Sequence, residues 1–95
     1  MSAYIIVRMH ITDEAKIQKY REATPPALEK YGATFIARSN DVLTLEGEKE
    51  TRRVIIIKFD SMEKAKGFYY SSEYQEAMKE REGGAEVEFI ALEGV

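Results

Sequence analysis

Four side chains of this sequence are candidates to bind or act on a small molecule: Arg8, His10, Arg38 and Tyr69. His10 is the only histidine, so it is the only side chain whose ordinary pKa lies near neutrality, and it could carry a proton as a general base. Arg8 would lie beside His10 on one face of a strand, where it could also be no more than a rim charge. Arg38 could hold a carboxylate or stabilise an oxyanion, because its planar guanidinium supplies geometry as well as charge. Tyr69 could place a hydroxyl in a cavity.

Three of these residues also have explanations that need no ligand. His10 could bond a loop carbonyl or water at the end of a strand. Arg38 could pair with Glu46 or Glu88, or with a carboxylate across a subunit interface. Tyr69 could belong to the core, as aromatic residues at helical spacing usually do.

The residue types present exclude several kinds of chemistry. The sequence has no cysteine, so it has no disulfide, no thiol nucleophile and no thiolate metal site. One histidine without a carboxylate cluster at ligand spacing does not predict a metal site, and no motif calls for a cofactor. Gly83-Gly84 follows a helix and ends it, whereas glycine-rich phosphate loops open one.

Composition predicts one globular domain over residues 1–95. The chain is 44% hydrophobic and 33% charged, which is the balance of a folded protein. Its net charge of −3, with cationic and acidic residues interleaved, gives no basic surface for nucleic acid. No apolar run is long enough to span a membrane and no secretory leader opens the chain. We therefore expect a cytoplasmic protein that binds neither nucleic acid nor membrane.

The elements that must position the candidate residues form an alternating series. The strongest strand signal is the run from Val54 to Phe59, because it contains four consecutive β-branched residues. Around it the pattern predicts a strand over 4–11, a helix from Asp13 interrupted at Pro25-Pro26, a strand over 34–38, a short strand over 42–45, a helix after Ser61 interrupted at Ser71-Ser72, and a last strand over 87–92. Ser72 with Gln75 could form a capping box there, with Ser71 as the competing cap.

This order predicts an α+β, ferredoxin-like βαββαβ fold, in which both helices cover one face of an antiparallel sheet. The period of two assigns one set of strand residues to the helix-covered face: Ile5, Val7, Met9, Phe35, Ala37, Ile55, Ile57, Phe59, Val87, Phe89 and Ala91. The remaining set faces away: Tyr4, Ile6, Arg8, His10, Thr34, Ile36, Arg38, Val54, Ile56, Lys58, Glu88, Ile90 and Leu92.

Six branched apolar residues of the second set would form a patch at or beyond the size that monomers usually expose. Burying each is worth at most about 1.5–3 kcal/mol. A second copy that presents the same face is the economical cover, so we expect a homodimer that pairs through this face. The polar members of the set would then line the space between the two sheets.

Short motifs along the chain resemble those of one known family. They are Tyr31-Gly32, Phe35-Ile36-Ala37-Arg38, Leu45-Glu46-Gly47, the strand from Val54 to Phe59 with Ser61, Phe68-Tyr69, Ser71, Glu73-Tyr74 and Arg81. In this order they are similar to the domain-of-unknown-function 1330 family, within the dimeric α+β barrel superfamily. The resemblance implies a ferredoxin-like homodimer whose sheets face each other, and it implies no established reaction.

The sequence departs from that family at a few positions. Ser39 and Asn40 stand where the family usually has glycines, beside Arg38, so the turn and any pocket there should differ in shape. Asp60 replaces a proline and Phe68 replaces a tryptophan, which are ordinary cap and core changes.

These observations lead to two hypotheses about function. The first is a homodimeric domain that binds a small molecule, and that could be a cofactor-independent enzyme acting on a small organic acid or aromatic compound. Its site would be the cationic group of Arg8, His10 and Arg38, with His10 as proton carrier and Arg38 as anion stabiliser. The alternative is a non-catalytic dimeric module in which these charges only organise the interface.

Overall fold

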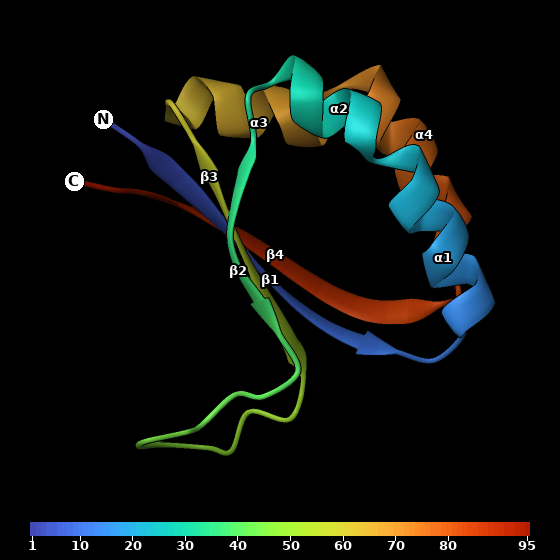
Figure 1. Ribbon diagram of the computed structural model, residues 1–95, viewed down its shortest axis with the longest axis vertical. Coiled ribbons are helices and arrows are strands. Elements are labelled where there is room, and N and C mark those ends of the chain that lie inside the picture. The colour runs from blue at the N-terminus through green and yellow to red at the C-terminus, as the bar shows by residue number, and fades with distance from the viewer.

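The computed structural model describes residues 1–95 as four strands and four helices arranged in two layers (Figure 1). The elements in chain order are β1 (Ala3–Ile11), α1 (Glu14–Ala23), α2 (Pro25–Lys30), β2 (Thr34–Ser39), β3 (Arg53–Phe59), α3 (Met62–Tyr70), α4 (Ser72–Glu80) and β4 (Ala85–Glu93). The strands form one antiparallel sheet in the order β2-β3-β1-β4, and all the helices lie over the same face of it (Figure 1). The predicted ferredoxin-like βαββαβ fold is confirmed.

The first helical connection begins and breaks at the predicted residues. Asp13 caps α1, because its side chain accepts hydrogen bonds from the backbone N–H groups of Ala15 and Lys16. The helix ends at Ala23 and a second one starts with Pro25, whose missing N–H costs nothing at that position. Gly32, with φ of 69°, then ends α2 and returns the chain to the sheet.

The second helical connection breaks at Ser71. The Oγ atom of Ser71 accepts from the backbone N–H of Tyr74 at 3.0 Å and donates to the carbonyl of Phe68 at 2.7 Å. Ser71 therefore ends α3 and caps α4, which confirms the alternative prediction that Ser71, and not Ser72, is the cap. The capping box of Ser72 and Gln75 does not form, because the Gln75 side chain instead donates to the carbonyl of Tyr69 at 2.7 Å.

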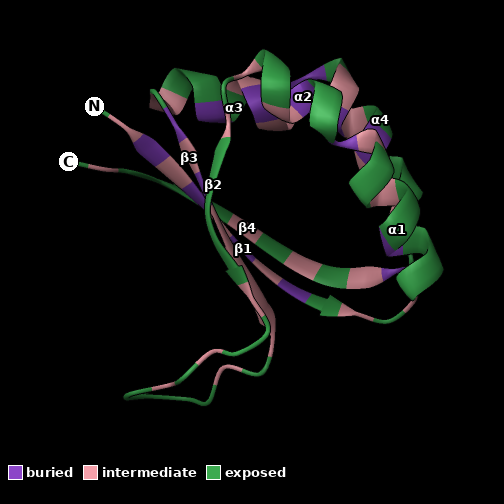
Figure 2. Ribbon diagram, viewed as in Figure 1, coloured by how far each residue is buried: buried purple, intermediate pink, exposed green.

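The core lies between the helices and alternate residues of the central strands (Figure 2). Its largest fully buried side chains are Tyr74, Phe59, Phe68, Ile17 and Val7. Phe68 packs on Phe59 and on Tyr74, with ring centroids 5.4 and 4.7 Å apart. An aromatic cluster thus joins α3 and α4 to the sheet.

The predicted short strand over residues 42–45 is wrong. Residues 40–52, which we call the arm, project away from the body and belong to no strand (Figure 1). Leu43 and Leu45 are 80% and 88% exposed at its end. A strand needs a hydrogen-bonded neighbour, and no other strand of the chain reaches this far, so the apolar alternation alone could not produce one.

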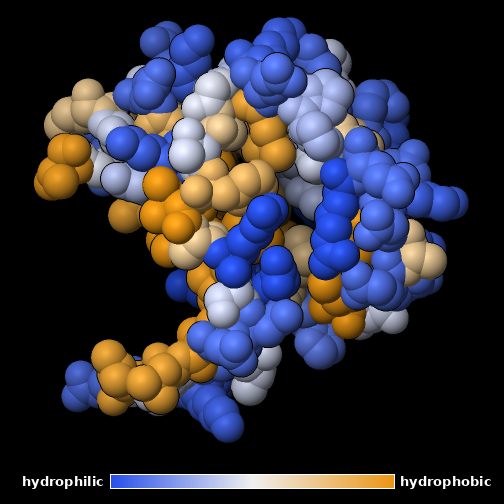
Figure 3. All heavy atoms as spheres, viewed as in Figure 1, coloured by the Kyte–Doolittle hydropathy of each residue, from blue (hydrophilic) through white to orange (hydrophobic).

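The face of the sheet opposite the helices, which we call the open face, has no cover within the chain. It carries Ile36, Ile90 and Leu92, which are 52%, 47% and 44% exposed, beside half-buried Ile6 and Ile56. Figure 3 shows apolar side chains gathered along the hollow between the body and the arm. None of the four helices has the length and apolar character needed to cross a membrane.

Candidate functional site

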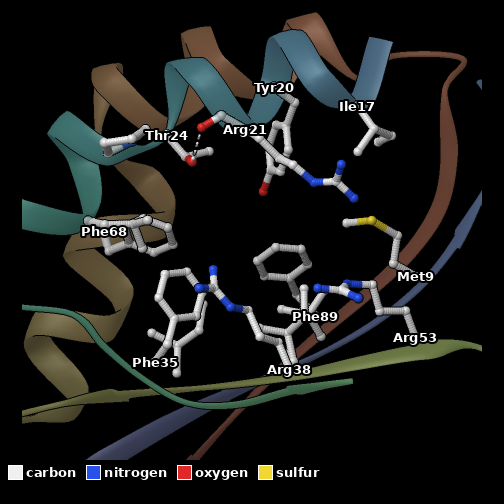
Figure 4. A pocket seen from close by; sticks show the side chains of 15 residues that line it. Met9, Ile17, Tyr20, Arg21, Thr24, Phe35, Arg38, Arg53, Phe68 and Phe89 are labelled. Carbon is white, nitrogen blue, oxygen red and sulfur yellow. Dashed lines mark hydrogen bonds between the residues drawn. The ribbon is translucent and has the colours of Figure 1, made fainter. Parts of the chain in front are cut away.

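A cavity of about 230 Å³ lies on the helix side of the sheet (Figure 4). The helices α1 and α2 cover it from one side, and the strands form the other. Its apolar walls come from both layers: Met9, Ile17, Leu28, Phe35, Phe68 and Phe89. Ten of its fifteen lining residues are hydrophobic, and none is an Asp or a Glu. A space of this kind suits a small molecule with an apolar body.

Arg38 enters this cavity because of a β-bulge. Phe35 pairs with Ile57 in β3 and Ala37 pairs with Ile56, so Ile36 is left without a partner. From Ala37 onward, each residue of β2 therefore points to the face opposite to the one that simple alternation predicts. Arg38 then pairs with Ile55 and shares its helix-facing side. The predicted positions of Arg38 and Ala37 are therefore wrong, because both residues lie on the side opposite to the one that strict alternation gives.

Arg53 brings a second guanidinium into the cavity from the start of β3. It pairs with Met9, which is buried beneath the helices, so its side chain lies on the same face. Figure 4 shows Arg38 and Arg53 rising from the sheet into the cavity. The ion pairs of the chain involve other cations: Arg8, Arg21, Lys30, Arg52 and Lys79.

Arg38 and Arg53 are therefore free of carboxylates in the folded chain. Arg38 lies over the ring of Phe35, with its Cζ atom 4.6 Å from the ring centroid, which is a weak cation–π contact that leaves the edge of the guanidinium available. Arg21 also reaches the cavity, but its Nη1 atom is bound to Glu14 at 2.7 Å. The cavity thus has two positive charges that nothing in the chain neutralises.

Tyr20 supplies a hydroxyl from the helix side. Its Oη atom lies 2.8 Å from that of Tyr74, which is fully buried. Burial raises the pKa of Tyr20 and that of Tyr74, so both phenols keep their protons at neutral pH. Arg81 donates to Tyr74 at 3.4 Å and lies over the ring of Tyr20. Burial alone would lower the pKa of Arg81, but the hydrogen bond to Tyr74 opposes this and the pKa is raised.

Arg8 and His10 lie on the open face, as predicted, and therefore face away from the cavity. Arg8 is bound to Glu50 at 3.4 Å and lies 3.8 Å from Glu88. Arg52 joins the same two carboxylates at 2.7 Å each. His10 is exposed near the end of β1, opposite Glu86 of β4. The predicted cationic group of Arg8, His10 and Arg38 does not form, because the sheet separates its members.

Tyr69 is also apart from Arg38. It lines a second cavity, of about 420 Å³, between α3 and the β1-β4 side of the sheet, together with Arg81 and Phe89. Its ring packs on those of Tyr74 and Phe89, with centroids 5.4 and 5.5 Å away. Tyr69 therefore packs against the core, which was the alternative explanation for its helical spacing, and it also lines this second cavity.

Glu50 joins the arm to the sheet. Hydrogen bonds from the Arg52 side chain and backbone, and the charge of Arg8, lower the pKa of Glu50 to about 2. The pKa of Glu50 in the folded chain is lower than its ordinary value of 4.5. The ionised carboxylate therefore stabilises the attachment of the arm above pH 4.5, and this stabilisation is lost as the pH falls from about 4.5 to about 2.

We expect the Glu50 carboxyl of the folded protein to titrate near pH 2 in a carbon-detected NMR experiment. Replacing Arg52 with Met should bring this midpoint back toward the ordinary value, because the largest cause of the shift is then removed. A midpoint that stays unchanged in Arg52→Met would show that the pair is not formed in solution.

No group of three or more His, Asp or Glu side chains is placed to hold a metal ion. The site defined by the structure is a cation-lined apolar cavity in a ferredoxin-like α+β protein. The chain belongs to the family described as domain of unknown function (DUF1330), whose model matches residues 2–95. A comparison with curated proteins found no match.

Solved structures share the fold at low identity. A protein of unknown function from Rhodopseudomonas palustris is 18% identical, with a TM-score of 0.76 over 99% of this chain and 82% of that one. SnoaB from Streptomyces nogalater, a cofactor-independent oxygenase, is 10% identical, with a TM-score of 0.67 over 99% and 93%. A dimeric protein of unknown function with a ferredoxin-like fold, from Bacteroides fragilis, is 17% identical, with a TM-score of 0.61 over 98% and 96%. These structures are similar in fold.

Sequence reasoning missed two residues of the cavity. Arg53 could have been predicted, because it occupies alternate positions with Ile55, Ile57 and Phe59 along the strand. It is therefore a charged residue on the face of the strand that the sequence assigns to the helices. Tyr20 has no local signal of this kind, because its hydroxyl is hydrogen-bonded to Tyr74, which is far away in the sequence.

Proposed function

We propose that the protein binds a small organic anion with an apolar body, such as an aromatic carboxylate, in the cavity on the helix side of the sheet. One observation carries this proposal: Arg38 and Arg53 reach into an apolar cavity that contains no carboxylate. A guanidinium binds a carboxylate through two parallel hydrogen bonds, and partial removal from water strengthens them. The hydrophobic walls would hold the remainder of the ligand.

An enzyme acting on such a ligand is compatible with this site. SnoaB, which has a similar fold, is a cofactor-independent oxygenase. The two chains share only 10% of their residues, so this likeness concerns the fold and not the reaction. His10 cannot serve as the proton carrier of this cavity, since it lies on the opposite face of the sheet. Any chemistry here would use the arginines and Tyr20.

The proposal is tested by the affinity for hydrocinnamate and for its neutral amide, measured by calorimetry. The acid should bind at least about tenfold more tightly, because a hydrogen bond to a charged group is worth about 1.5–3 kcal/mol. Arg38→Met and Arg53→Met should each remove most of this preference.

Arg8→Met is the matched control, since it removes the same group from the other face. It should leave the affinity for hydrocinnamate unchanged. Equal binding of acid and amide by the wild type, or an equal loss in Arg8→Met, would contradict the proposal.

We further infer that the working unit is a homodimer paired through the open face. The exposed Ile36, Ile90 and Leu92 form an apolar surface with Ile6 and Ile56, which pair across the sheet. The arm carries two further exposed leucines, Leu43 and Leu45. The dimeric ferredoxin-like protein from Bacteroides fragilis supports this inference. Burial of this surface between two copies removes it from water without any other partner.

A second candidate function is a dimeric module without a ligand. The four-residue charge network of Arg8, Arg52, Glu50 and Glu88 favours it, because it lies on the open face and joins the arm to the sheet. In that case Arg8 and His10 would organise the interface. The same calorimetric titrations distinguish the two functions, since this one predicts no preference for the acid.

A further inference from the structure

We infer that the Tyr20 hydroxyl is a hydrogen-bond donor to the bound molecule, and that this molecule is therefore an oxo acid: a carboxylate that also carries a carbonyl group. The inference rests on the proposed function and adds a second polar anchor to it. It follows from the direction of the hydrogen bonds among Arg81, Tyr74 and Tyr20.

The direction is fixed by the buried Tyr74. A guanidinium can only donate, so Arg81 gives a hydrogen to the Oη atom of Tyr74 across 3.4 Å. The only other partner of that atom is the Oη atom of Tyr20, at 2.8 Å. If Tyr20 were the donor, the proton of Tyr74 would have no acceptor in a fully buried position, which is costly. Tyr74 therefore donates to Tyr20.

The hydrogen of Tyr20 is then free. Its oxygen accepts from Tyr74, so its own O–H must point elsewhere, and Tyr20 lines the cavity. Figure 4 shows its hydroxyl directed into the space above the ring of Phe89. The donors arranged in series polarise one another, so Tyr20 presents a stronger donor than an isolated phenol does. The raised pKa of Tyr20 keeps the proton in place.

The position of Tyr20 decides what it binds. Arg38 and Arg53 extend from β2 and β3 at the sheet wall, whereas Tyr20 descends from α1 on the opposite wall (Figure 4). A carboxylate held by the two guanidinium groups leaves Tyr20 facing another part of the ligand. That part must accept a hydrogen bond, because Tyr20 has already used its acceptor site. A carbonyl oxygen has the required property.

The test compares two pairs of acids that differ in one carbonyl: phenylpyruvate with hydrocinnamate, and benzoylpropionate with phenylbutyrate. Wild-type protein should bind the oxo acid of at least one pair about tenfold more tightly. Tyr20→Phe, which keeps the ring, should abolish this preference, so that the two members of a pair bind with equal affinity. Tyr74→Phe should reduce the preference by about two- to threefold, because Tyr20 is no longer oriented.

The outcomes separate this inference from the proposed function. Wild-type binding of all four acids without any preference for the carbonyl overturns the role of Tyr20 and leaves the anion site intact. An equal loss for both members of a pair in Tyr20→Phe also overturns it, since the carboxylate itself would then be the acceptor. If the wild-type protein binds none of the four acids, the anion site and the role of Tyr20 both fail.

Discussion

The Ile56→Glu variant should be a monomer at concentrations where we expect the wild-type protein to be a dimer. Ile56 lies near the centre of the open face, paired with Ile6 of β1. In a symmetric dimer each copy would bring one glutamate into an apolar interface, and the two charges would both lose water and repel each other. We expect the dissociation constant to rise by at least about a hundredfold, or about 3 kcal/mol. Sedimentation velocity over a range of concentrations measures it.

Two further variants make this result specific. Ile56→Val keeps the apolar surface and should remain a dimer. Ile90→Glu places the same charge on the other side of the open face, at a residue that is 47% exposed in the single chain, so it should yield a folded monomer as judged by circular dichroism. A wild-type protein that sediments as single chains at every concentration would refute the dimer.

The Tyr74→Ala variant should lose about 3–5 kcal/mol of stability, which is the range for aromatic truncations in a core. Tyr74 is 0% exposed and touches the rings of Phe68, Tyr69 and Phe89. Its loss would leave a large cavity and would remove the partner of Arg81. For a domain of this size the melting temperature should fall by at least about 12 °C, as measured by calorimetry.

Tyr74→Phe is the matched control for packing. It keeps the ring and removes only the hydroxyl, so it should cost about 1–2 kcal/mol through the lost hydrogen bonds. If the phenylalanine and alanine variants melted at the same temperature, the hydroxyl and not the ring would hold this part of the core together.

The two sides of the sheet carry the features behind two separate proposals. The open face carries the surface that we expect to pair, with the charge network of Arg8 and Glu50 beside it. The helix side carries the cavity, with Arg38, Arg53 and Tyr20. All the residues that line this cavity belong to one chain. We therefore expect Arg38→Met to weaken ligand binding without changing the dimer.

The sequence determined the fold because each local signal agreed with its neighbours. The β-branched run of β3, the cap at Asp13, the proline pair after α1 and the serine before α4 all acted through contacts a few residues away. The apolar residues of the open face could also be predicted from the sequence, because residues of β1, β3 and β4 alternate regularly between the two faces of the sheet. Such signals need no knowledge of the tertiary structure.

Only the tertiary structure decided where the candidate site residues lie. The β-bulge at Ile36 places Arg38 on the helix side of the sheet and not on the open face. No local sequence pattern predicted this bulge. Residues 42–45 had the pattern of a strand but found no neighbour to pair with. Tyr20 and Tyr74 are distant in sequence and meet only because α1 and α4 pack together. Strand register and helix packing depend on partners far along the chain, so periodicity within one segment could not decide them.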